Sequence, residues 1–464
     1  MSGDVVPFEA MLAMQAREDE DKRLIERTRL TRTLNVPTND DVVKRRLRAC
    51  GVPAILFGED PAQRRDRLKA QGALMLTSTP ELARQWHRIM ETQKQIEEAA
   101  RVTKRAPGTV YHTDGGRKLL DARQRIAQFS IERARSRLER ARAFRESSHD
   151  YVARLRTLKT FHCTGSFVGD TRPLSSLSVH NGLVATSSWS GAATIWDSSG
   201  KPVRHLTGAK DRLSDIKLRP GDYSANDLSI ATGGVERQIN LYDGTATSPA
   251  VVLSGHSDRI SRLAFHPDGR TLISTSFDLT FRMWDLETKS CVVSQDGNST
   301  ALYGLGVHPD GSLVGTGDLG GNGRVWDLRT GRAVIDLVGH IKQVLCVDFA
   351  HNGYLVATGS GDNTARIWDL RKKTSVYTLP GHVNMVSDVK FAPHDRFLVT
   401  AGYDSTARLW SGRDFSAITS LQGHEDKLTA VAVSADARHL YTASFDRTWK
   451  LWSIVEDKNA MDVQ

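Results

Sequence analysis

The sequence predicts an all-β seven-bladed propeller preceded by a basic α-helical N-terminal region. The first observation is a repeat, because an aromatic residue followed by Asp or Ser recurs at nearly constant spacing, at Trp196, Tyr242, Trp284, Trp326, Trp368, Trp410 and Trp452. The second is the segment 1–160, which is rich in helix formers and basic side chains. At 464 residues the chain is also too long for one ordinary core, so we expect at least two units.

Charge is placed unevenly along the chain. Residues 1–160 hold 33 Lys and Arg against 22 Asp and Glu, a net charge of +11, whereas residues 161–464 hold 30 against 32, a net charge of −2. A basic arm beside a near-neutral body favours polyanion binding, although a solvated arm without a ligand has the same composition. We expect no membrane span and no secretory signal. The four cysteines form no CxxC pair, which argues against disulfides and zinc and favours a reducing compartment.

Two short helices are predicted within residues 34–75. The first has Thr38 or Asn39 as its N-cap and ends before a glycine, and the second has Asp60 as its cap and Pro61 at its first position, ending at the next glycine. Their outer faces would be basic. The side chains that we interpret as RNA-binding on these faces are Lys44, Arg45, Arg46, Arg48, Arg64, Arg65 and Arg67.

Residues 76–154 predict a basic helical region. No helix breaker interrupts residues 81–103, and residues 117–159 hold 13 Lys and Arg against 5 acidic residues. This second stretch would lie on RNA phosphates or be held by a protein partner, or else it is a solvated basic helix. A thin apolar stripe on it comprises Ile126, Phe129 and Phe144, and the arginines assigned to RNA are Arg133, Arg137 and Arg140. Residues 1–33 are helical or disordered, and residues 456–464 form a tail.

The repeat itself occupies residues 155–455. A Gly-His pair precedes four of its tryptophans, and the distance from His to Trp is the same in all four. This is the signature of the WD40 repeat, which implies a hydrogen-bonded His, Ser/Thr, Asp and Trp in each blade. By this resemblance the tetrads are His256, Ser274, Asp278, Trp284; His340, Thr358, Asp362, Trp368; His382, Thr400, Asp404, Trp410; and His424, Thr442, Asp446, Trp452. A trio that recurs four times is structural rather than catalytic, so we expect no enzyme, cofactor or metal site.

Three units depart from this pattern, and the ring must also close. The departures are Ala209 and Glu236 before Tyr242, Asn298 and Gly320 before Trp326, and Ser190 before Trp196. We expect these blades to depend more on strand pairing and core packing. Residues 155–167 resemble the outermost strand of a blade, so we expect them to pair with strands near 438–453 and close the ring; a linker is the alternative.

The string VPTNDDVVKRRLR…LFGEDPAQRRDRL resembles the splicing factor motif, which precedes a WD40 propeller in the pre-mRNA-processing factor four family. The resemblance covers about residues 34–75 and 150–455. It implies a nuclear, non-enzymatic scaffold of the U4/U6 small nuclear ribonucleoprotein and the U4/U6·U5 tri-snRNP. Its N-terminal region would bind U4 and U6 small nuclear RNA and a partner resembling pre-mRNA-processing factor three. Its propeller would dock other tri-snRNP proteins.

Two further expectations concern partners. Members of this family often carry a longer segment ahead of the motif that docks a cyclophilin, but here the motif already begins near Leu34, which argues against that contact. The alternative function is a WD40 substrate adaptor for a ubiquitin ligase or chromatin complex, which would need a recruiting motif that we do not see in the N-terminal region.

In WD40 domains, the residue before the turn Asp and those three and five after the blade His reach the narrow end of the propeller. These positions predict a partner-binding rim of Arg259, Phe277, Tyr303, Met385, Tyr403, Lys427 and Phe445. Several large apolar groups on one exposed face favour a covering partner. Alternatively, the aromatic side chains fold inward over the channel mouth.

Overall fold

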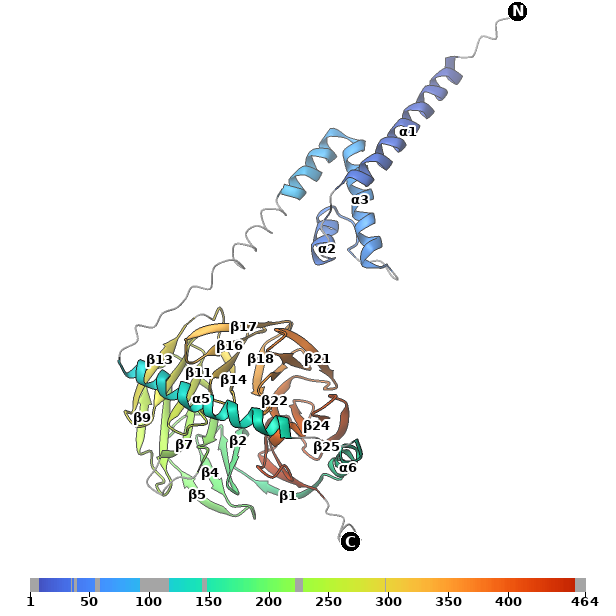
Figure 1. Cartoon of the computed structure of the whole chain (residues 1–464). Coiled ribbons are helices and arrows are strands. Elements are labelled where there is room, and N and C mark those ends of the chain that lie inside the picture. The colour runs from blue at the N-terminus through green and yellow to red at the C-terminus, as the bar shows by residue number, and fades with distance from the viewer. Residues whose placement is uncertain are drawn as a thin grey trace, which may run out of the picture. The chain divides into compact units, whose positions relative to one another are not determined.

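The computed structural model describes residues 8–34, 36, 40–54, 59–91, 117–143, 148–221, 228–296 and 298–454. The chain forms two compact units, Met1–Gly108 and Thr109–Gln464 (Figure 1). None of the described helices combines the length and the apolar character needed to cross a bilayer.

The N-terminal unit is helical. It contains α1 (Phe8–Thr33), α2 (Asp40–Ala49), α3 (Pro61–Ser78) and a further helical stretch over residues 80–91. Its small core is formed by Val43, Leu47, Leu68, Met75 and Trp86. Asp60 precedes α3 and Pro61 begins it, as predicted, and the backbone N–H of Asp60 donates to Gln63 Oε1 at 3.1 Å. The predicted caps of α2, Thr38 and Asn39, lie outside the described residues.

The predicted end of α3 at Gly72 is wrong, because the helix continues to Ser78. A Cβ atom at Gly72 would lie 2.6 Å from the Trp86 ring, so this glycine lets the indole pack against α3. The missing side chain therefore serves a helix–helix contact rather than a helix end.

The second unit is a ring of seven four-stranded antiparallel sheets, which confirms the predicted fold class (Figure 1). The first three blades are β2 (Leu174–His180), β3 (Leu183–Ser188), β4 (Ala193–Trp196) and β5 (Pro202–Leu206); β6 (Leu213–Leu218), β7 (Leu228–Gly234), β8 (Gln238–Asp243) and β9 (Val251–Ser254); and β10 (Ile260–Phe265), β11 (Thr271–Ser276), β12 (Phe281–Asp285) and β13 (Ser290–Gln295).

The next three blades have the same order. They are β14 (Leu302–Val307), β15 (Leu313–Asp318), β16 (Asn322–Asp327) and β17 (Arg332–Val338); β18 (Val344–Phe349), β19 (Leu355–Ser360), β20 (Thr364–Asp369) and β21 (Thr374–Pro380); and β22 (Val386–Phe391), β23 (Phe397–Gly402), β24 (Thr406–Ser411) and β25 (Ala417–Gln422), with a short 3-10 turn, η1 (Pro393–Asp395), between β22 and β23.

The seventh blade closes the ring with a strand from the other end of the unit. It comprises β26 (Leu428–Val433), β27 (His439–Ser444), β28 (Thr448–Ser453) and, on its outside, β1 (His162–Val168). β1 pairs with β28 from His162 opposite Ser453 to Val168 opposite Thr448, which confirms the predicted closure. The strand is shorter than predicted because residues 155–158 end helix α6 (Ser148–Leu158), whose Leu158 is buried in the propeller core.

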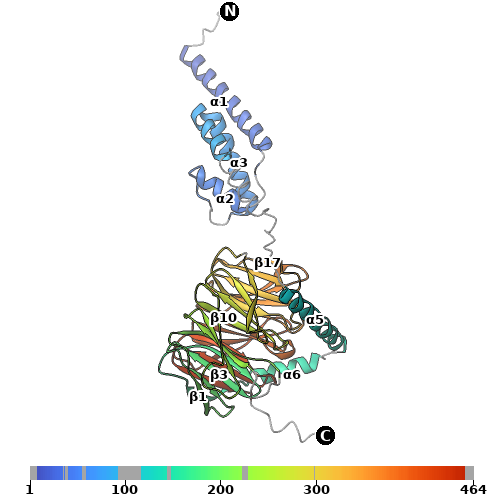
Figure 2. The same ribbon diagram turned by 90° about the vertical axis from the view of Figure 1, so that its left-hand side faces the viewer.

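Helix α5 (Arg117–Ala143) and helix α6 lie on one face of the propeller (Figures 1 and 2). Leu119, Ala122 and Ile126 of α5 are buried in the same hydrophobic cluster as Trp326 and Leu328. Tyr151 of α6 hydrogen-bonds Ser411 at 2.8 Å. Phe144, the last member of the predicted apolar stripe, lies outside the described residues. The apolar stripe of α5 is therefore covered by the chain's own propeller.

Candidate functional site

A chain of hydrogen bonds crosses four of the seven blades. In the blade from β18 to β21, Trp368 Nε1–H donates to Thr358 Oγ1 at 2.8 Å, this hydroxyl lies 2.7 Å from His340 Nε2, and His340 Nδ1 lies 2.8 Å from Asp362. The same links occur in the other three predicted tetrads: His256, Ser274, Asp278 and Trp284; His382, Thr400, Asp404 and Trp410; and His424, Thr442, Asp446 and Trp452.

The electrostatics of the tetrad around His340 favour a neutral histidine beside an ionised aspartate. Burial lowers the pKa of His340, and it outweighs the hydrogen bond and the charge of Asp362, which raise it. Burial alone would raise the pKa of the Asp362 carboxyl, but hydrogen bonds from Thr364 and His340 lower it to about 2. A neutral imidazole that donates from Nδ1 and accepts at Nε2 satisfies every group in the chain.

The three divergent blades retain only part of this network. Trp326 Nε1–H still donates to Thr316 at 3.0 Å, but Asn298 instead donates to the carbonyl of Leu279 at 3.3 Å. In the blade from β6 to β9, Glu236 accepts hydrogen bonds from the backbone N–H groups of Lys210 and Asp211 at 2.5 and 3.0 Å. The carboxylate of Glu236 thus holds the loop that the tetrad aspartate holds elsewhere.

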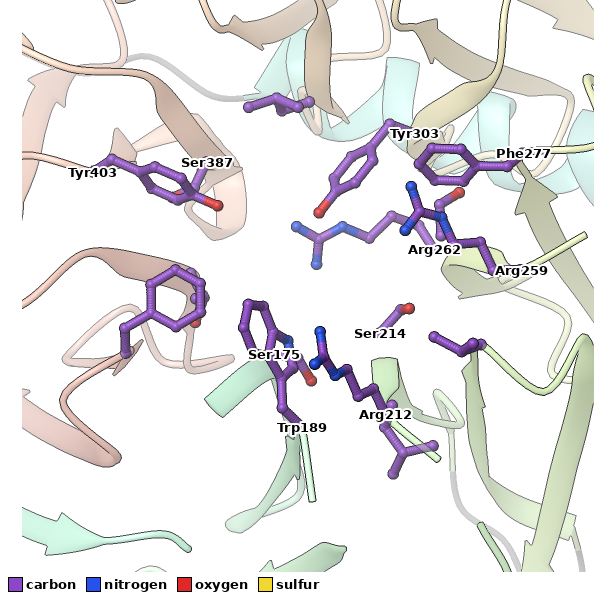
Figure 3. A pocket seen from close by; sticks show the side chains of 16 residues that line it. Ser175, Trp189, Arg212, Ser214, Arg259, Arg262, Phe277, Tyr303, Ser387 and Tyr403 are labelled. Carbon is purple, nitrogen blue, oxygen red and sulfur yellow. The ribbon is translucent and has the colours of Figure 1, made fainter. Parts of the chain in front are cut away.

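At the opposite ends of the strands from α5, a cavity of about 200 Å³ opens into the ring (Figure 3). Strand β10 shows that the cavity and α5 lie at opposite ends of the strands. It begins at the cavity and ends just before His266, whose ring lies 5.7 Å from the Phe129 ring of α5. Five aromatic residues line the cavity: Trp189, Phe277, Tyr303, Tyr403 and Phe445. Three arginines line it as well: Arg212, Arg259 and Arg262.

The predicted rim residues gather around this cavity. Arg259, Phe277, Tyr303, Tyr403 and Phe445 line it directly. The two others lie at its edge, since Lys427 Nζ is 5.7 Å from the Tyr403 ring and the Met385 sulfur accepts from Gln343 at 3.5 Å. The predicted aromatic side chains are half-buried at the channel mouth. Each ring therefore lies between the two expected positions, fully exposed on the rim or folded inward over the channel.

The rings at the mouth contact one another and the cations. Trp189 and Phe445 meet edge to face with centroids 4.9 Å apart, and Phe277 and Tyr303 do so at 6.2 Å. Arg259 lies over the Phe277 ring at 3.7 Å from its centroid, and Arg212 lies over Trp189 at 5.2 Å. These contacts make the mouth a fixed aromatic and cationic surface.

Sequence reasoning missed Trp189 and Arg212, although the rule used for the rim contains them. Trp189 precedes Ser190, which stands at the turn-Asp position of its blade, and Arg212 lies three residues after Ala209, which stands at a His position. Applying the rule to the divergent blades would have found both. Arg262 has no such signal. It follows a register shift in β10, at the position where the inner strands β6 and β22 carry Asp215 and Asp388.

Buried charges surround the channel below the mouth. Asp215 is completely buried and accepts from Ser176 at 2.5 Å and from the backbone N–H of Leu263 at 2.8 Å, with Lys217 at 3.1 Å. Burial alone would lower the pKa of the Arg262 guanidinium, but the attraction of Asp215 raises it above its ordinary value. Arg262 is therefore a permanent cation at the floor of the cavity.

The predicted RNA-binding residues of α2 and α3 do not share one environment. Arg45 and Arg48 are exposed, while Lys44, Arg46 and Arg65 are partly buried. Lys44 pairs with Asp40 at 2.7 Å, and Arg46 donates to the sulfur of Met90 at 3.5 Å. The outward position expected for Arg64 is wrong.

Two arginines of α3 instead join the parts of the helical unit. Arg64 is only 5% exposed and donates to Asp40 at 2.5 Å, which ties α3 to α2. Arg67 donates to both oxygens of Glu59 at 2.7 and 2.8 Å and to the carbonyl of Pro53 at 2.6 Å. Both therefore stabilise the fold rather than extend a basic outer face.

On α5, the three predicted RNA-binding arginines divide in the same way. Arg137 donates to Asp310 at 2.8 Å and to the carbonyl of Asn352 at 2.5 Å, so it holds the helix against the propeller. Arg133 and Arg140 are exposed, and Arg133 lies over the ring of Phe129 at 5.3 Å. The structure packs α5 against the chain's own propeller, an environment that was not among the three expected for this helix.

Within the part of the chain that the structure describes, no three His, Cys, Asp or Glu side chains gather closely enough to hold a metal ion. The four cysteines, all within the described ranges, are unpaired: Cys50, Cys163, Cys291 and Cys346.

Two known sequence families match the chain. The family described as WD domain, G-beta repeat matches residues 247–285, 331–369, 373–411 and 415–453. These are the four repeats whose tetrads are complete. The family described as pre-mRNA processing factor 4 (PRP4) like matches residues 43–71, which span most of α2 and α3. The chain is therefore a WD40-repeat β-propeller protein with a PRP4-like helical domain.

The chain is also similar to proteins named Prp4 in several organisms. The chain is 38% identical over 230 residues to U4/U6 small nuclear ribonucleoprotein Prp4 of Homo sapiens, covering 47% of this chain and 41% of that protein. It is 30% identical over 267 residues to PRP4 of Saccharomyces cerevisiae, covering 54% of each. It is 34% identical over 258 residues to an uncharacterised WD repeat-containing protein of Schizosaccharomyces pombe, covering 53% of each.

The chain thus spans about half the length of the curated relatives it matches. The PRP4-like domain, the WD40 repeats and these relatives confirm the resemblance to the PRP4 family that the splicing factor motif indicated.

Proposed function

We propose that this protein is a non-enzymatic, nuclear splicing scaffold of the U4/U6 small nuclear ribonucleoprotein and of the tri-snRNP. The observation that carries the proposal is the PRP4-like match at residues 43–71, which falls on a basic helix pair in a chain that also forms a WD40 propeller. Relatives of the chain are named U4/U6 small nuclear ribonucleoprotein Prp4 and PRP4. The N-terminal helical unit would bind the paired U4 and U6 RNA and a pre-mRNA-processing factor three-like protein.

The RNA contact is proposed for the exposed side chains of the helical unit. Arg45 and Arg48 lie on the exposed side of α2, whereas Arg64 and Arg67 are engaged inside the unit. Duplex RNA is recognised mostly by its shape and its phosphates, for which exposed guanidinium groups are suited. We therefore assign the phosphate contacts to Arg45 and Arg48 first.

The test is a titration of the full chain with fluorescent U4/U6 duplex at several salt concentrations. Each lost phosphate contact lowers the slope of log K against log salt by about 0.9 for a duplex, so Arg45→Ala with Arg48→Ala should lower it by about 1–2. The control is Arg332→Ala with Lys372→Ala, which removes two exposed basic side chains from the propeller. An unchanged slope for the α2 variant, or an equal loss in the control, would reject this assignment.

The propeller would dock other tri-snRNP proteins through the channel mouth. Changing Tyr403 and Phe445 together to Ala removes two of its aromatic residues, and a matched control changes Val334 and Val338 of the outer strand β17, which are 44% and 68% exposed. Both variants are checked by thermal unfolding and then used to recover tri-snRNP proteins from nuclear extract. We expect the first to lose a partner and the second to keep all of them. Full recovery with a folded Tyr403 and Phe445 variant rejects the mouth as the docking site.

A further inference from the structure

We propose that the channel mouth is a carboxylate-binding site, which takes an Asp or Glu side chain from an acidic, extended segment of a protein partner, with Arg262 at its floor. The inference deepens the docking role proposed above and rests on it, because it names the chemistry that the propeller recognises.

Arg262 is the first argument. The residue is only 9% exposed, and its guanidinium points into the cavity (Figure 3). Among the described residues this guanidinium donates no hydrogen bond, and its ion-pair partner, Asp215, lies 3.9 Å away. A guanidinium carries five N–H donors, and those of Arg262 open onto the cavity. A ligand with two acceptor oxygens in one plane would satisfy this group.

Asp215 does not already satisfy Arg262. One of its oxygens accepts from Ser176 and from the backbone N–H of Ile216, at 2.5 and 3.0 Å, and lies 3.1 Å from Lys217. Its other oxygen accepts from the backbone N–H of Leu263 at 2.8 Å. Asp215 therefore neutralises Arg262 at a distance but leaves its donors directed into the cavity.

The rest of the lining also favours an anion. Arg212 and Arg259 stand at the sides of the cavity, and no Asp or Glu is among the described residues that line it. Residues 161–464 as a whole are nearly neutral in sum, with 30 basic and 32 acidic residues. The positive charge at the mouth is therefore local, and a low-dielectric recess strengthens its effect on an entering carboxylate.

An acidic protein segment fits better than RNA. Bases stack on free aromatic faces, but each of the five rings at the mouth has a cation within about 6 Å of its centroid, a cation–π distance. A base would have to displace these cations. The cavity of about 200 Å³ is also smaller than the ~300–1,000 Å³ of pockets that hold whole small molecules, so it suits a single side chain. The aromatic rim would contact the apolar neighbours of that side chain.

The test begins with a peptide selection on the purified 464-residue chain. Random twelve-residue peptides displayed on phage are selected for binding, and the enriched peptides are synthesised with fluorescein and measured by anisotropy. We expect Asp or Glu at a fixed position, and we expect replacement of that residue by Asn or Gln to weaken binding at least tenfold. Enrichment without an acidic position would overturn the proposal.

Variants then place the bound peptide. Arg262→Met should weaken its binding at least tenfold and Arg259→Gln several-fold, whereas the control Arg332→Gln, an exposed arginine of β17, should leave it unchanged. Because the loss of a buried charge can impair folding, thermal unfolding is measured for each variant. If Arg262→Met does not fold, two other variants are used, Arg262→Lys and the double variant Arg212→Gln with Arg259→Gln. Each of them should also weaken peptide binding.

Three outcomes would overturn the proposal. The first is a folded Arg262 variant that binds the peptide as tightly as the wild type does. If its melting temperature is also lowered, Arg262 has a purely structural role beside Asp215. The second is equal binding of the peptide in which Asn or Gln replaces the acidic residue. The third is competition by a twelve-nucleotide single-stranded RNA that itself depends on Arg262. These measurements use neither U4/U6 RNA nor spliceosomal proteins, so their failure is distinguishable from failure of the proposed splicing function.

Discussion

Arg137 of α5 and Asp310 of the β14–β15 turn form a bidentate ion pair, with Arg137 Nη2 2.8 Å from the carboxylate, although 173 residues separate them in the chain. The same guanidinium donates to the carbonyl of Asn352 in the next blade. One arginine therefore joins the helix to two blades. This contact assigns α5 to the propeller unit, so a division of the chain at residue 160 would remove the helix from its own binding surface.

We predict that Arg137→Met loosens α5. The change leaves Asp310, which is only 4% exposed, without its partner, and we expect a loss of about 1–3 kcal/mol because the pair is partly accessible to solvent. Hydrogen exchange of residues 117–143 should speed up while the blades stay protected. Arg140→Met is the matched control, because Arg140 is exposed on the same helix. Equal exchange in both variants would contradict a clamping role for Arg137.

A second prediction compares a complete tetrad with a divergent blade. Asp404 accepts from His382, from the backbone N–H of Val383 and from Thr406. Asp404→Ala leaves the buried His382 ring and the partly buried Thr406 hydroxyl without this acceptor and should lower the free energy of unfolding by about 1–3 kcal/mol. Asn298→Ala removes one hydrogen bond of 3.3 Å and should cost less than about 1 kcal/mol. Denaturant unfolding measures both, and equal losses would argue against the network.

The third prediction concerns acid. Burial lowers the pKa of His340 and His382 below the ordinary value of 6.5, so the unfolded chain binds these protons more readily than the folded one. Their stabilisation is complete above pH 6.5 and is lost as the pH falls below it. Asp362, with its pKa lowered to about 2 by hydrogen bonds that outweigh burial, adds a second loss below the ordinary value of 3.8.

We therefore expect the melting temperature to fall between about pH 7.5 and about pH 5.5, and to fall less in a His382→Gln variant, because Gln takes up no proton. His162→Gln is the control, since this histidine is exposed on β1. A drop of the same size in wild type and in His382→Gln would show that this histidine does not supply the pH dependence.

The propeller was predictable because the residues that define each blade recur at a fixed spacing in the sequence. The distance in sequence from His256 to Trp284 recurs unchanged in three other blades, and the backbone geometry of a four-stranded blade turns that spacing into one hydrogen-bonded chain. The rim followed from the same register. Trp189 was missed only because its blade has Ser190 in place of the aspartate used as the marker.

Contacts between distant segments had no such local signal. The sequence places Arg64 on a basic helix face, yet Asp40 on another helix draws it into the interior. Arg137 belongs to an arginine-rich helix, but only the folded ring brings Asp310 and Asn352 to it. A charge pattern along one helix shows which side chains are ionised and does not show which partners the fold supplies.

The last prediction concerns closure of the ring. Phe167 of β1 stacks on Trp449 with ring centroids 4.4 Å apart, and a Cβ atom at Gly200 would overlap the Phe167 ring. Phe167 thus fills the seam between the last blade and the β4–β5 turn of the first. Gly200 has a φ of +80°, which favours glycine, and its missing side chain also makes room for the phenyl ring.

Phe167→Ala should therefore weaken the seam rather than one blade. Because the ring is half-buried, we expect a loss of about 1–3 kcal/mol, below the about 3–5 kcal/mol of a fully buried Phe. Val168→Ala on the same strand is the control, since Val168 is 72% exposed and should change stability by less than about 0.5 kcal/mol. Hydrogen exchange should increase in β1 and β28 for Phe167→Ala alone. If the middle blades lose protection equally, the ring unfolds as one unit and its closure is no weaker than the rest.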